Sequence, residues 1–335
     1  MKRLTFTMVA AALALVAGCS GEGKPGASAK PRIALIYKAT TNPFFQAMEQ
    51  GAREKAKEMN VDLEVAGIES ETDADRQADL VRSMLGRKVQ AIIIAPASSV
   101  GIVTPLLRAQ AAKIPIINID NRINKEEAAR QGLKVATFIG PDNFEGARKV
   151  GACACDIVKK KIAAGKPGKV LILRGIDGVE NAEARRAGFE AAVKEAGLEI
   201  AGSQSANWQS EDAQKVTAAM LAATPEVHAI LCANDKMALG AIAAVKARGK
   251  TGEILIVGYD NIDLAREAMA RGEMHATVEQ NPALMGALGV ECALAALHGG
   301  TLPEVTPVPT QLITPEMVVD AKAGQPKPPP KSGGG

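Results

Sequence analysis

The sequence predicts an α/β protein built of two similar lobes, each a doubly wound parallel sheet, with a ligand cleft between them. From residue 32 onward, short apolar stretches alternate with longer stretches of helical periodicity, and this order begins again after the Gly-Lys-Pro-Gly stretch at 165–168. Runs such as Ala91-Ile-Ile-Ile-Ala95 are apolar throughout, as strands covered on both faces are. A length of 335 residues is sufficient for two domains.

The first lobe is expected to alternate strands and helices up to residue 164. Its strands are predicted at 32–37, 62–66, 91–95, 115–119 and 136–139. Helical periodicity covers 44–59, 74–86, 100–112 and 143–164.

The second lobe repeats this order. Its strands are predicted at 169–173, 199–203, 228–232, 254–257 and 275–278, and its helices at 181–196, 210–223, 235–248, 262–271 and 283–298. Ligands of such sheets bind beyond the carboxyl ends of the strands. The residues that follow each strand are therefore the candidate binding surface.

The first 19 residues are predicted to be a lipoprotein signal peptide. Lys2-Arg3 supplies positive charge, residues 4–17 are apolar, and Val16-Ala-Gly-Cys19 resembles a bacterial lipobox whose Cys19 is lipidated. An ordinary signal peptide or a single membrane anchor is the alternative, although about 14 apolar residues are short for a span that needs about 20. Residues 20–31 then form a flexible tether, and the Pro- and Gly-rich residues 323–335 a disordered tail.

Charge and cysteine usage narrow the class of protein. The net charge of +3 comes from 40 basic and 37 acidic residues spread along the chain, which argues against a nucleic-acid partner. The three histidines show no metal-ligand spacing to the remaining cysteines, so we expect no metal and no cofactor. Those cysteines are expected to be buried free thiols: Cys153, Cys155, Cys232 and Cys292.

The turn after the first strand carries the most distinctive residues. Asn42-Pro43 is typical of a capped helix start, and Phe44 and Phe45 follow it in a chain that has only one Trp, two Tyr and six Phe. Adjacent rings in a strand-to-helix turn favour a ligand with an apolar face. A capped helix with two core phenylalanines is the alternative interpretation.

Planar polar residues and the single Trp follow the other strands. Side chains of Asn, Asp, Gln and Arg can each engage two hydroxyl groups with fixed geometry, and Lys adds a charged donor. Each could instead cap the helix that follows it. Together with the aromatic residues they predict a cleft for a polyhydroxylated small molecule, formed by Lys38, Asn42, Phe44, Phe45, Asp120, Asn121, Arg185, Trp208, Asn234, Asp260 and Gln280.

An ordered series of motifs then indicates a family. The series is Asn42-Pro-Phe-Phe45, Ala95-Pro-Ala-Ser-Ser-Val100, Glu183-Ala-Arg-Arg186, Ser203-Gln-Ser-Ala-Asn-Trp208, Cys232-Ala-Asn-Asp-Lys-Met-Ala-Leu-Gly240, Val257-Gly-Tyr-Asp260 and Ala276-Thr-Val-Glu-Gln-Asn-Pro282. In this order, over residues 32–320, the chain resembles bacterial periplasmic sugar-binding proteins of the ribose- and allose-binding type.

The resemblance implies roles for the candidate residues. Phe44, with Phe45 or Trp208, would sandwich a sugar ring, and the hydroxyls would bind Asn42, Asp120, Arg185, Asn234, Asp260 and Gln280. Lys38 matches a lysine of allose-type sites. Ala95 and Asn121 depart from the ribose-type pattern, so the ligand need be neither ribose nor allose.

The resemblance also implies a hinge of three crossings, near residues 140, 280 and 309. The N-terminal lobe would then comprise 32–140 plus 281–309, and the C-terminal lobe 141–280 plus 310–322, with a last strand near 310–320. The expected protein is a monomer outside the cytoplasm, in the periplasm or on the outer cell face. It would close on a pentose or hexose and pass it to an ABC-type sugar permease in the membrane.

Two other functions remain open from the residues alone. A receptor for a sugar, polyol or signal molecule in chemotaxis or quorum sensing would have the same features. A glycoside-acting enzyme would need a carboxyl pair, and Asp120 with Asp260 is the candidate. We do not expect enzymatic activity, because an Arg and several amides in the cleft would hold both carboxyls ionised and leave no general acid.

Overall fold

The computed structural model describes residues 30–162 and 168–322. The predicted signal peptide with Cys19, the predicted tether up to residue 29 and the predicted tail at 323–335 lie outside the described residues. Within the described part, the helices are too short or too polar to cross a membrane.

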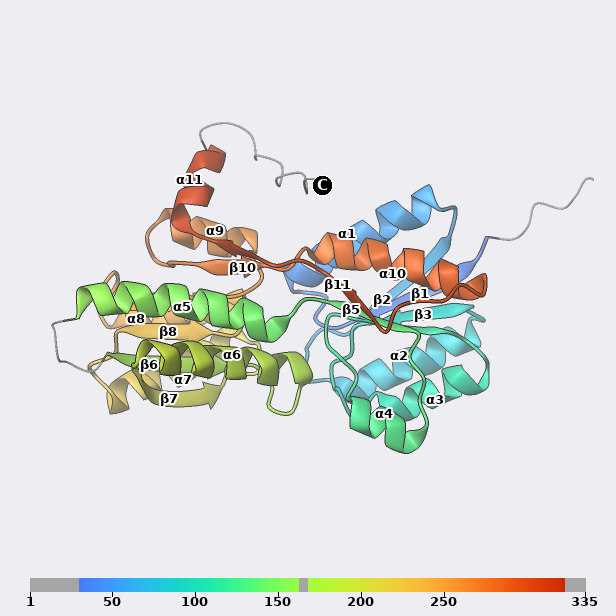
Figure 1. Cartoon of the computed structure of the whole chain (residues 1–335), viewed down its shortest axis with the longest axis horizontal. Coiled ribbons are helices and arrows are strands. Elements are labelled where there is room, and N and C mark those ends of the chain that lie inside the picture. Colours follow the sequence, from blue (N-terminus) through green and yellow to red (C-terminus); the bar gives the residue numbers. More distant parts are fainter. Residues whose placement is uncertain (1–29, 163–167, 323–335) are drawn as a thin grey trace, which may run out of the picture. The chain divides into compact units, whose positions relative to one another are not determined.

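The first sheet contains six parallel strands in the order β11-β5-β4-β3-β1-β2 (Figure 1). The strands are β1 (Arg32–Tyr37), β2 (Asp62–Gly67), β3 (Ala91–Ile94), β4 (Ile116–Ile119), β5 (Thr137–Gly140) and β11 (Val305–Pro307). The helices of this lobe are α1 (Pro43–Glu58), α2 (Ala74–Gly86), α3 (Val103–Ala111), α4 (Lys125–Gln131) and α10 (Pro282–Leu297).

Apolar side chains on both faces of this sheet are buried. Ile33 and Leu35 of β1 belong to one core cluster, and Ala34 and Ile36 of the same strand belong to another. Successive residues of a strand point to opposite faces, so both faces are covered. This explains why the strands are uninterrupted apolar runs.

Helix α10 lies against α1 although more than 200 residues separate them in sequence (Figure 1). Two glycines allow the close approach. A Cβ on Gly51 would lie 2.0 Å from the carbonyl oxygen of Ala283, and a Cβ on Gly286 would lie 2.0 Å from that of Met48. Helix α10 therefore packs in the first lobe.

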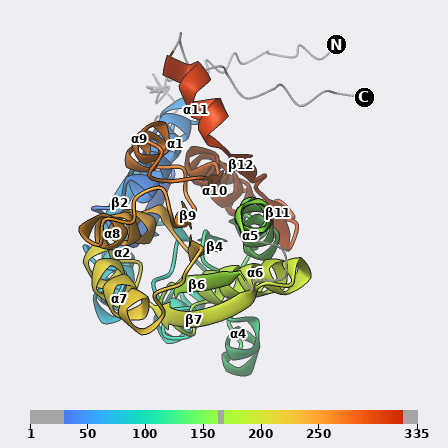
Figure 2. The same ribbon diagram turned by 90° about the vertical axis from the view of Figure 1, so that its left-hand side faces the viewer.

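The second sheet contains four parallel strands in the order β7-β6-β8-β9. They are β6 (Lys169–Arg174), β7 (Glu199–Ser205), β8 (Ala229–Cys232) and β9 (Leu255–Val257). Strands β6, β7 and β9 of this sheet are labelled in Figure 2. The helices of this lobe are α5 (Asn143–Lys161), α6 (Glu180–Ala196), α7 (Ser210–Ala223), α8 (Asp235–Ala247) and α9 (Asp263–Ala270).

A short antiparallel pair stands beside the second sheet. Strand β10 (Thr277–Glu279) pairs with β12 (Gln311–Ile313) and reaches the β9 segment through single bridges, Val257 to Ala276 and Asp260 to Glu279. The chain passes between the lobes three times, after β5, after β10 and after β11.

The alternation of strands and helices predicted from the sequence is confirmed, and the bounds of β1 and α2 coincide with the prediction. The predicted strand at 310–320 is wrong beyond residue 313. Pro315 instead begins helix α11 (Pro315–Lys322), because its fixed φ suits the first turn of a helix.

Besides α11, two elements were not predicted. Helix α4 has a local signal, since the side chain of Asn124 accepts from the backbone of Glu127 and the left-handed Gly132 ends the helix. It spans seven residues, too few to show an apolar period. Strand β11 has three residues and is specified by its partner β5, which no local pattern reveals.

Candidate functional site

The carboxyl ends of the strands of both lobes surround one cavity. Ten of the eleven side chains predicted to bind a ligand line it, and Glu71 and Asn181 join them. The lining residues are Lys38, Asn42, Phe44, Phe45, Glu71, Asp120, Asn181, Arg185, Trp208, Asn234, Asp260 and Gln280.

The turn at residues 42–45 is both a capped helix start and an aromatic part of the cavity lining. Asn42 caps α1, because its Oδ1 accepts from the backbone of Phe44 at 3.1 Å. The rings of Phe44 and Phe45 meet edge to face with centroids 5.0 Å apart, and both line the cavity. The helix start is thus a scaffold that holds the two rings at the cavity.

Three lining residues hold backbone conformations that side-chain-bearing residues seldom adopt. The φ angle is 62° at Asp120, 63° at Trp208 and 126° at Asp260. Such conformations cost about 1–3 kcal/mol each and persist where the surrounding structure imposes them. Each of these residues lies in a turn that directs its side chain into the cavity.

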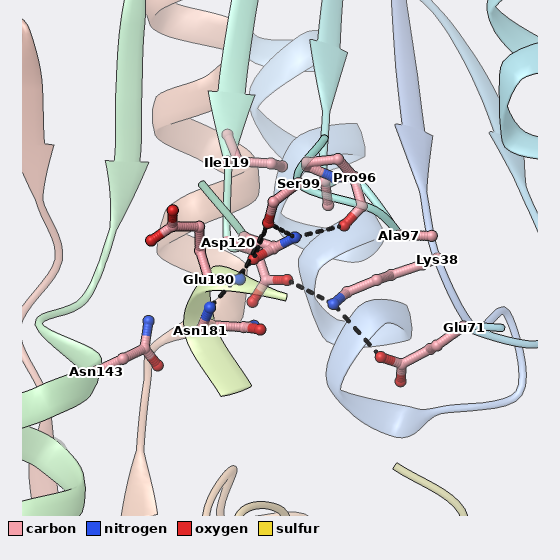
Figure 3. Close-up of polar contacts among 12 residues, drawn as sticks. Lys38, Glu71, Pro96, Ala97, Ser99, Ile119, Asp120, Asn143, Glu180 and Asn181 are labelled. Atoms are coloured by element: carbon pink, nitrogen blue, oxygen red, sulfur yellow. Dashed lines mark hydrogen bonds and ion pairs between the residues drawn. The ribbon is translucent and has the colours of Figure 1, made fainter. Parts of the chain in front are cut away.

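A buried ion cluster occupies the first-lobe side of the cavity (Figure 3). The Lys38 Nζ lies 3.4 Å from Glu71 Oε2 and 3.7 Å from Asp120 Oδ2. It also lies 5.8 Å from the ring centroids of both Phe45 and Trp208. The Lys38 charge therefore sits at the edge of the space between the aromatic side chains of the two lobes.

Burial controls the ionisation of these carboxyls. Loss of water raises the pKa of Glu71 and of Asp120, and the charge of Lys38 opposes the rise in both. Burial and the neighbouring cations therefore act in opposite directions on the ionisation of these carboxyls. Burial also raises the pKa of Asp260 well above its ordinary value, against the opposing charge of Arg185.

Arg185 is held in one orientation on the second-lobe side. Its Nε donates to Asn143 Oδ1 at 2.8 Å, its Nη1 to the carbonyl of Ala233 at 2.8 Å and its Nη2 to Gln280 Oε1 at 3.0 Å. Its Nη1 lies 3.7 Å from Asp260 Oδ1, which also accepts from Gln280 Nε2 at 2.6 Å. The guanidinium, carboxylate and amide thus form one rigid polar face.

Two buried acceptors at the cavity have unused capacity. Within the described residues, Asp120 Oδ2 and Asn181 Oδ1 are buried and accept no hydrogen bond. Buried polar atoms nearly always have a partner. A hydroxyl-rich molecule in the cavity would supply the missing donors.

Asn121 is the predicted site residue that the structure does not bring to the cavity. Its Nδ2 donates to the carbonyl of Pro96 at 2.9 Å, and its Oδ1 accepts from the backbone of Asn181 at 3.2 Å. The turn at Asp120 separates the two neighbours, so that Asp120 faces the cavity and Asn121 does not.

Glu71 and Asn181 were missed in the sequence. Glu71 lies in the loop after β2, a position to which the strand-end rule applies. Asn181 is the second residue of α6 and comes seven residues after the end of β6, where spacing alone gives no signal.

The described residues contain neither a metal-binding cluster nor a disulfide. Among 30–162 and 168–322, no group of three His, Cys, Asp or Glu side chains could hold a metal ion. Cys153 is half-buried, Cys155, Cys232 and Cys292 are buried, and all four are free thiols. Burial raises the pKa of Cys155 to about 11, which keeps it protonated near neutral pH.

Comparisons with known proteins agree with this geometry. Residues 33–301 match the family described as periplasmic binding protein domain. The D-ribose/D-allose-binding protein of Pseudomonas aeruginosa is 39% identical over 292 residues, which cover 85% of this chain and 89% of that protein. The D-allose-binding periplasmic protein of Escherichia coli is 36% identical in a match that covers 82% of this chain and 87% of that protein.

A solved structure is similar at the level of the whole fold. It is an ABC transporter periplasmic solute binding protein from Actinobacillus succinogenes with bound D-allose, 37% identical in sequence. The TM-score is 0.79, and the match covers 87% of this chain and 100% of that one.

Proposed function

Because the chain belongs to the periplasmic binding protein domain family, we propose that it captures a monosaccharide in the cavity between its lobes and delivers it to an ABC-type sugar permease. The observation that carries this proposal is the composition of the cavity. Aromatic side chains from both lobes line it together with a buried set of planar polar groups. Sugar rings have apolar C–H faces and a rim of hydroxyls, which these two kinds of side chain complement.

The proposed contacts divide by chemistry. The rings of Phe44, Phe45 and Trp208 enclose the sugar faces. The hydroxyls bind Lys38, Asn42, Glu71, Asp120, Asn181, Arg185, Asn234, Asp260 and Gln280. Two different pentoses or hexoses would differ in which of these polar groups they satisfy.

Capture follows from the division of the site between two lobes. We take residues 32–140 plus 281–309 as one lobe and 141–280 plus 310–322 as the other. Phe44 and Asp120 belong to the first, and Arg185 and Trp208 to the second. A sugar that contacts both sets binds the closed form better than an open one, and so shifts the population toward closure.

We place the protein outside the cytoplasm, as members of a periplasmic family are, and anchor it through a lipid on Cys19. The permease would accept the closed, sugar-loaded monomer. The similar proteins are solute-binding proteins, and we infer that binding is not followed by chemistry on the sugar. Recovery of an altered sugar after incubation would contradict that inference.

A thermal-shift screen tests the function. Pentoses, hexoses, polyols and nucleosides are added singly, and a sugar that binds only the folded protein at 100 times its Kd adds about 2.7 kcal/mol to the free energy of unfolding. The Trp208→Ala variant should lose the shift, whereas the exposed control Lys113→Ala should keep it. If no polyhydroxylated compound raises the midpoint of the wild type, the sugar assignment is wrong.

A further inference from the structure

Outside the cavity, the two lobes also meet at the first turn of α6. We propose that Ser99 and Asn121 of the first lobe cap this helix of the second lobe and thereby act as positioning residues that hold the closed form. The proposal rests on the proposed function for its consequence, sugar retention, but not for the contact itself.

Helix α6 cannot cap itself at its N-cap residue. That residue is Val179, which has no polar side-chain atom to accept from the first turn. The first backbone N–H groups of a helix have no partner within the helix. Other α-helices of the chain, such as α1, α4 and α8, use an Asn at this position, whose side chain accepts from the first turn.

The first lobe supplies the missing acceptors (Figure 3). Glu180 N donates to Ser99 Oγ at 3.0 Å, and Asn181 N donates to Asn121 Oδ1 at 3.2 Å. Ser99 is 1% exposed and Asn121 is 0% exposed, so both bonds are shielded from water. In most helices the acceptor for the first-turn N–H groups is a residue of the same chain segment. In α6 the donors belong to the second lobe and the acceptors to the first.

The two acceptors are fixed before they meet the helix. Asn121 Nδ2 donates to the carbonyl of Pro96 at 2.9 Å and to Ser99 Oγ at 3.2 Å. Asn118 Nδ2 donates to the carbonyl of Asn121 at 2.8 Å. These bonds all lie within the first lobe, so opening the lobes leaves the acceptors in place and exposes only the α6 donors.

Asn181 connects this contact to the ligand cavity. Its backbone N–H joins Asn121, while its side chain lines the cavity with an unused buried acceptor. A third bond at the rim, from Asn124 Nδ2 to Glu180 Oε1 at 3.1 Å, adds a contact between the same two segments. Closure around a sugar and capping of α6 are therefore achieved in one movement.

The consequence is kinetic. The capping bonds exist only in the closed form, so their loss should speed release of the sugar and leave its entry unchanged. Because one such bond contributes modestly to stability, Ser99→Ala should raise the dissociation rate about 3- to 10-fold. The association rate should stay at its wild-type value.

A second pair of variants isolates the backbone donor. Glu180 is the first helical residue, and Val179 before it is already extended (φ −91°, ψ 125°), so Glu180→Pro keeps the helix and removes the N–H. Glu180→Ala removes only the rim bond to Asn124 and serves as its control. Glu180→Pro should release sugar faster than Glu180→Ala does.

The test combines these variants in stopped-flow measurements with D-ribose and D-allose as probes. Ser99→Ala should accelerate release in the wild-type background and should not accelerate it further in the Glu180→Pro background, because both changes remove the same bond. Equal effects of Ser99→Ala in the two backgrounds would overturn the proposal.

Amide hydrogen exchange measures the capping contact itself rather than the release of sugar. First-turn amides normally exchange freely, so protection of the Glu180 and Asn181 amides that is lost in Ser99→Ala and Asn121→Ala supports the contact. Unprotected amides at both positions, with and without added sugar, would overturn it. If neither probe binds while the amides are protected, the proposed sugar fails and the capping contact stands.

Discussion

The indole of Trp208 lies directly on the backbone of Gly175. A Cβ on Gly175 would come within 2.1 Å of Trp208 Cζ2, so no other residue fits there without moving the ring. Gly175 follows the last residue of β6, and Trp208 stands in a turn after β7 with a left-handed φ of 63°. One aromatic wall of the cavity thus depends on a glycine of the neighbouring strand end.

We expect Gly175→Ala to weaken sugar binding by displacing this wall. Forcing an extra methyl group into a packed site costs about 1–3 kcal/mol, which corresponds to about one to two decades in affinity. Titration calorimetry with the sugar found by the thermal-shift screen measures the change. The matched control is Gly86→Ala, where a Cβ would meet open space, and an unchanged Kd for Gly175→Ala would show that Trp208 is not a wall of the site.

Removing the Asp260 carboxylate should reduce affinity through the polar face. Its Oδ1 accepts from Gln280 and lies 3.7 Å from an Arg185 nitrogen, so Asp260→Ala removes an acceptor and frees two donors. Loss of a buried hydrogen-bonding partner costs about 1–3 kcal/mol, and we expect a matching rise in Kd by calorimetry. Wild-type affinity in this variant would exclude Asp260 from the site.

A glycine at position 260 separates the backbone effect from the side-chain effect. The φ of 126° at Asp260 is one that glycine adopts without strain. Asp260→Gly should therefore bind sugar as weakly as Asp260→Ala does but unfold at a higher urea concentration. Equal unfolding midpoints for the two variants would mean that the backbone there is not strained.

The buried Lys38 should couple energetically to Glu71. Lys38→Met leaves two carboxyls without their cation, and removing one partner of a buried pair typically costs about 3–5 kcal/mol of stability. Glu71→Gln combined with Lys38→Met removes one of those carboxyl charges, so the double variant should recover part of the loss. Urea denaturation of the four proteins in the cycle measures the coupling, and additive losses would refute it.

The sequence could predict the fold because its signals are local and repeated. Apolar runs such as residues 91–95 and the helical period of 74–86 need no knowledge of distant partners. Strand β11 and the antiparallel pairing of β12 lack such signals, since three residues are positioned by the strands beside them.

The site was predictable where a residue directly follows a strand. Asn121 shows the limit, because adjacent residues in a turn point in different directions and only Asp120 reaches the cavity. Ionisation shows another limit. The sequence indicates the Arg and amides that favour ionised carboxyls, but not the extent of burial, which raises the pKa of Asp120 and Asp260 and is a property of the packed structure.

Asp235 should make the stability of the fold depend on pH in an unusual direction. The carboxylate is 0% exposed, and it accepts from Thr277 Oγ1 at 2.7 Å and from the backbone of Ile262 at 3.0 Å. Burial raises its pKa to about 6, against about 3.9 in an unfolded chain. Between these values the folded protein binds the proton and the unfolded chain does not, so the free energy of unfolding should fall as pH rises from about 4 to about 6.

The measurement is the difference between wild type and Asp235→Asn in urea unfolding across this pH range. The Asn variant should be less stable at every pH, because its NH₂ group takes the place of an oxygen that accepts from a backbone or hydroxyl donor. It has no carboxyl proton to release, so its stability should not change with pH through this position. Half-buried carboxylates such as Glu127 and Glu273, whose pKa values neighbouring hydrogen bonds lower, act in the opposite direction. They are present in both proteins and cancel in the difference. The wild type should lose up to about 3 kcal/mol relative to the variant between pH 4 and 6, and parallel curves would mean that Asp235 stays ionised in the folded protein.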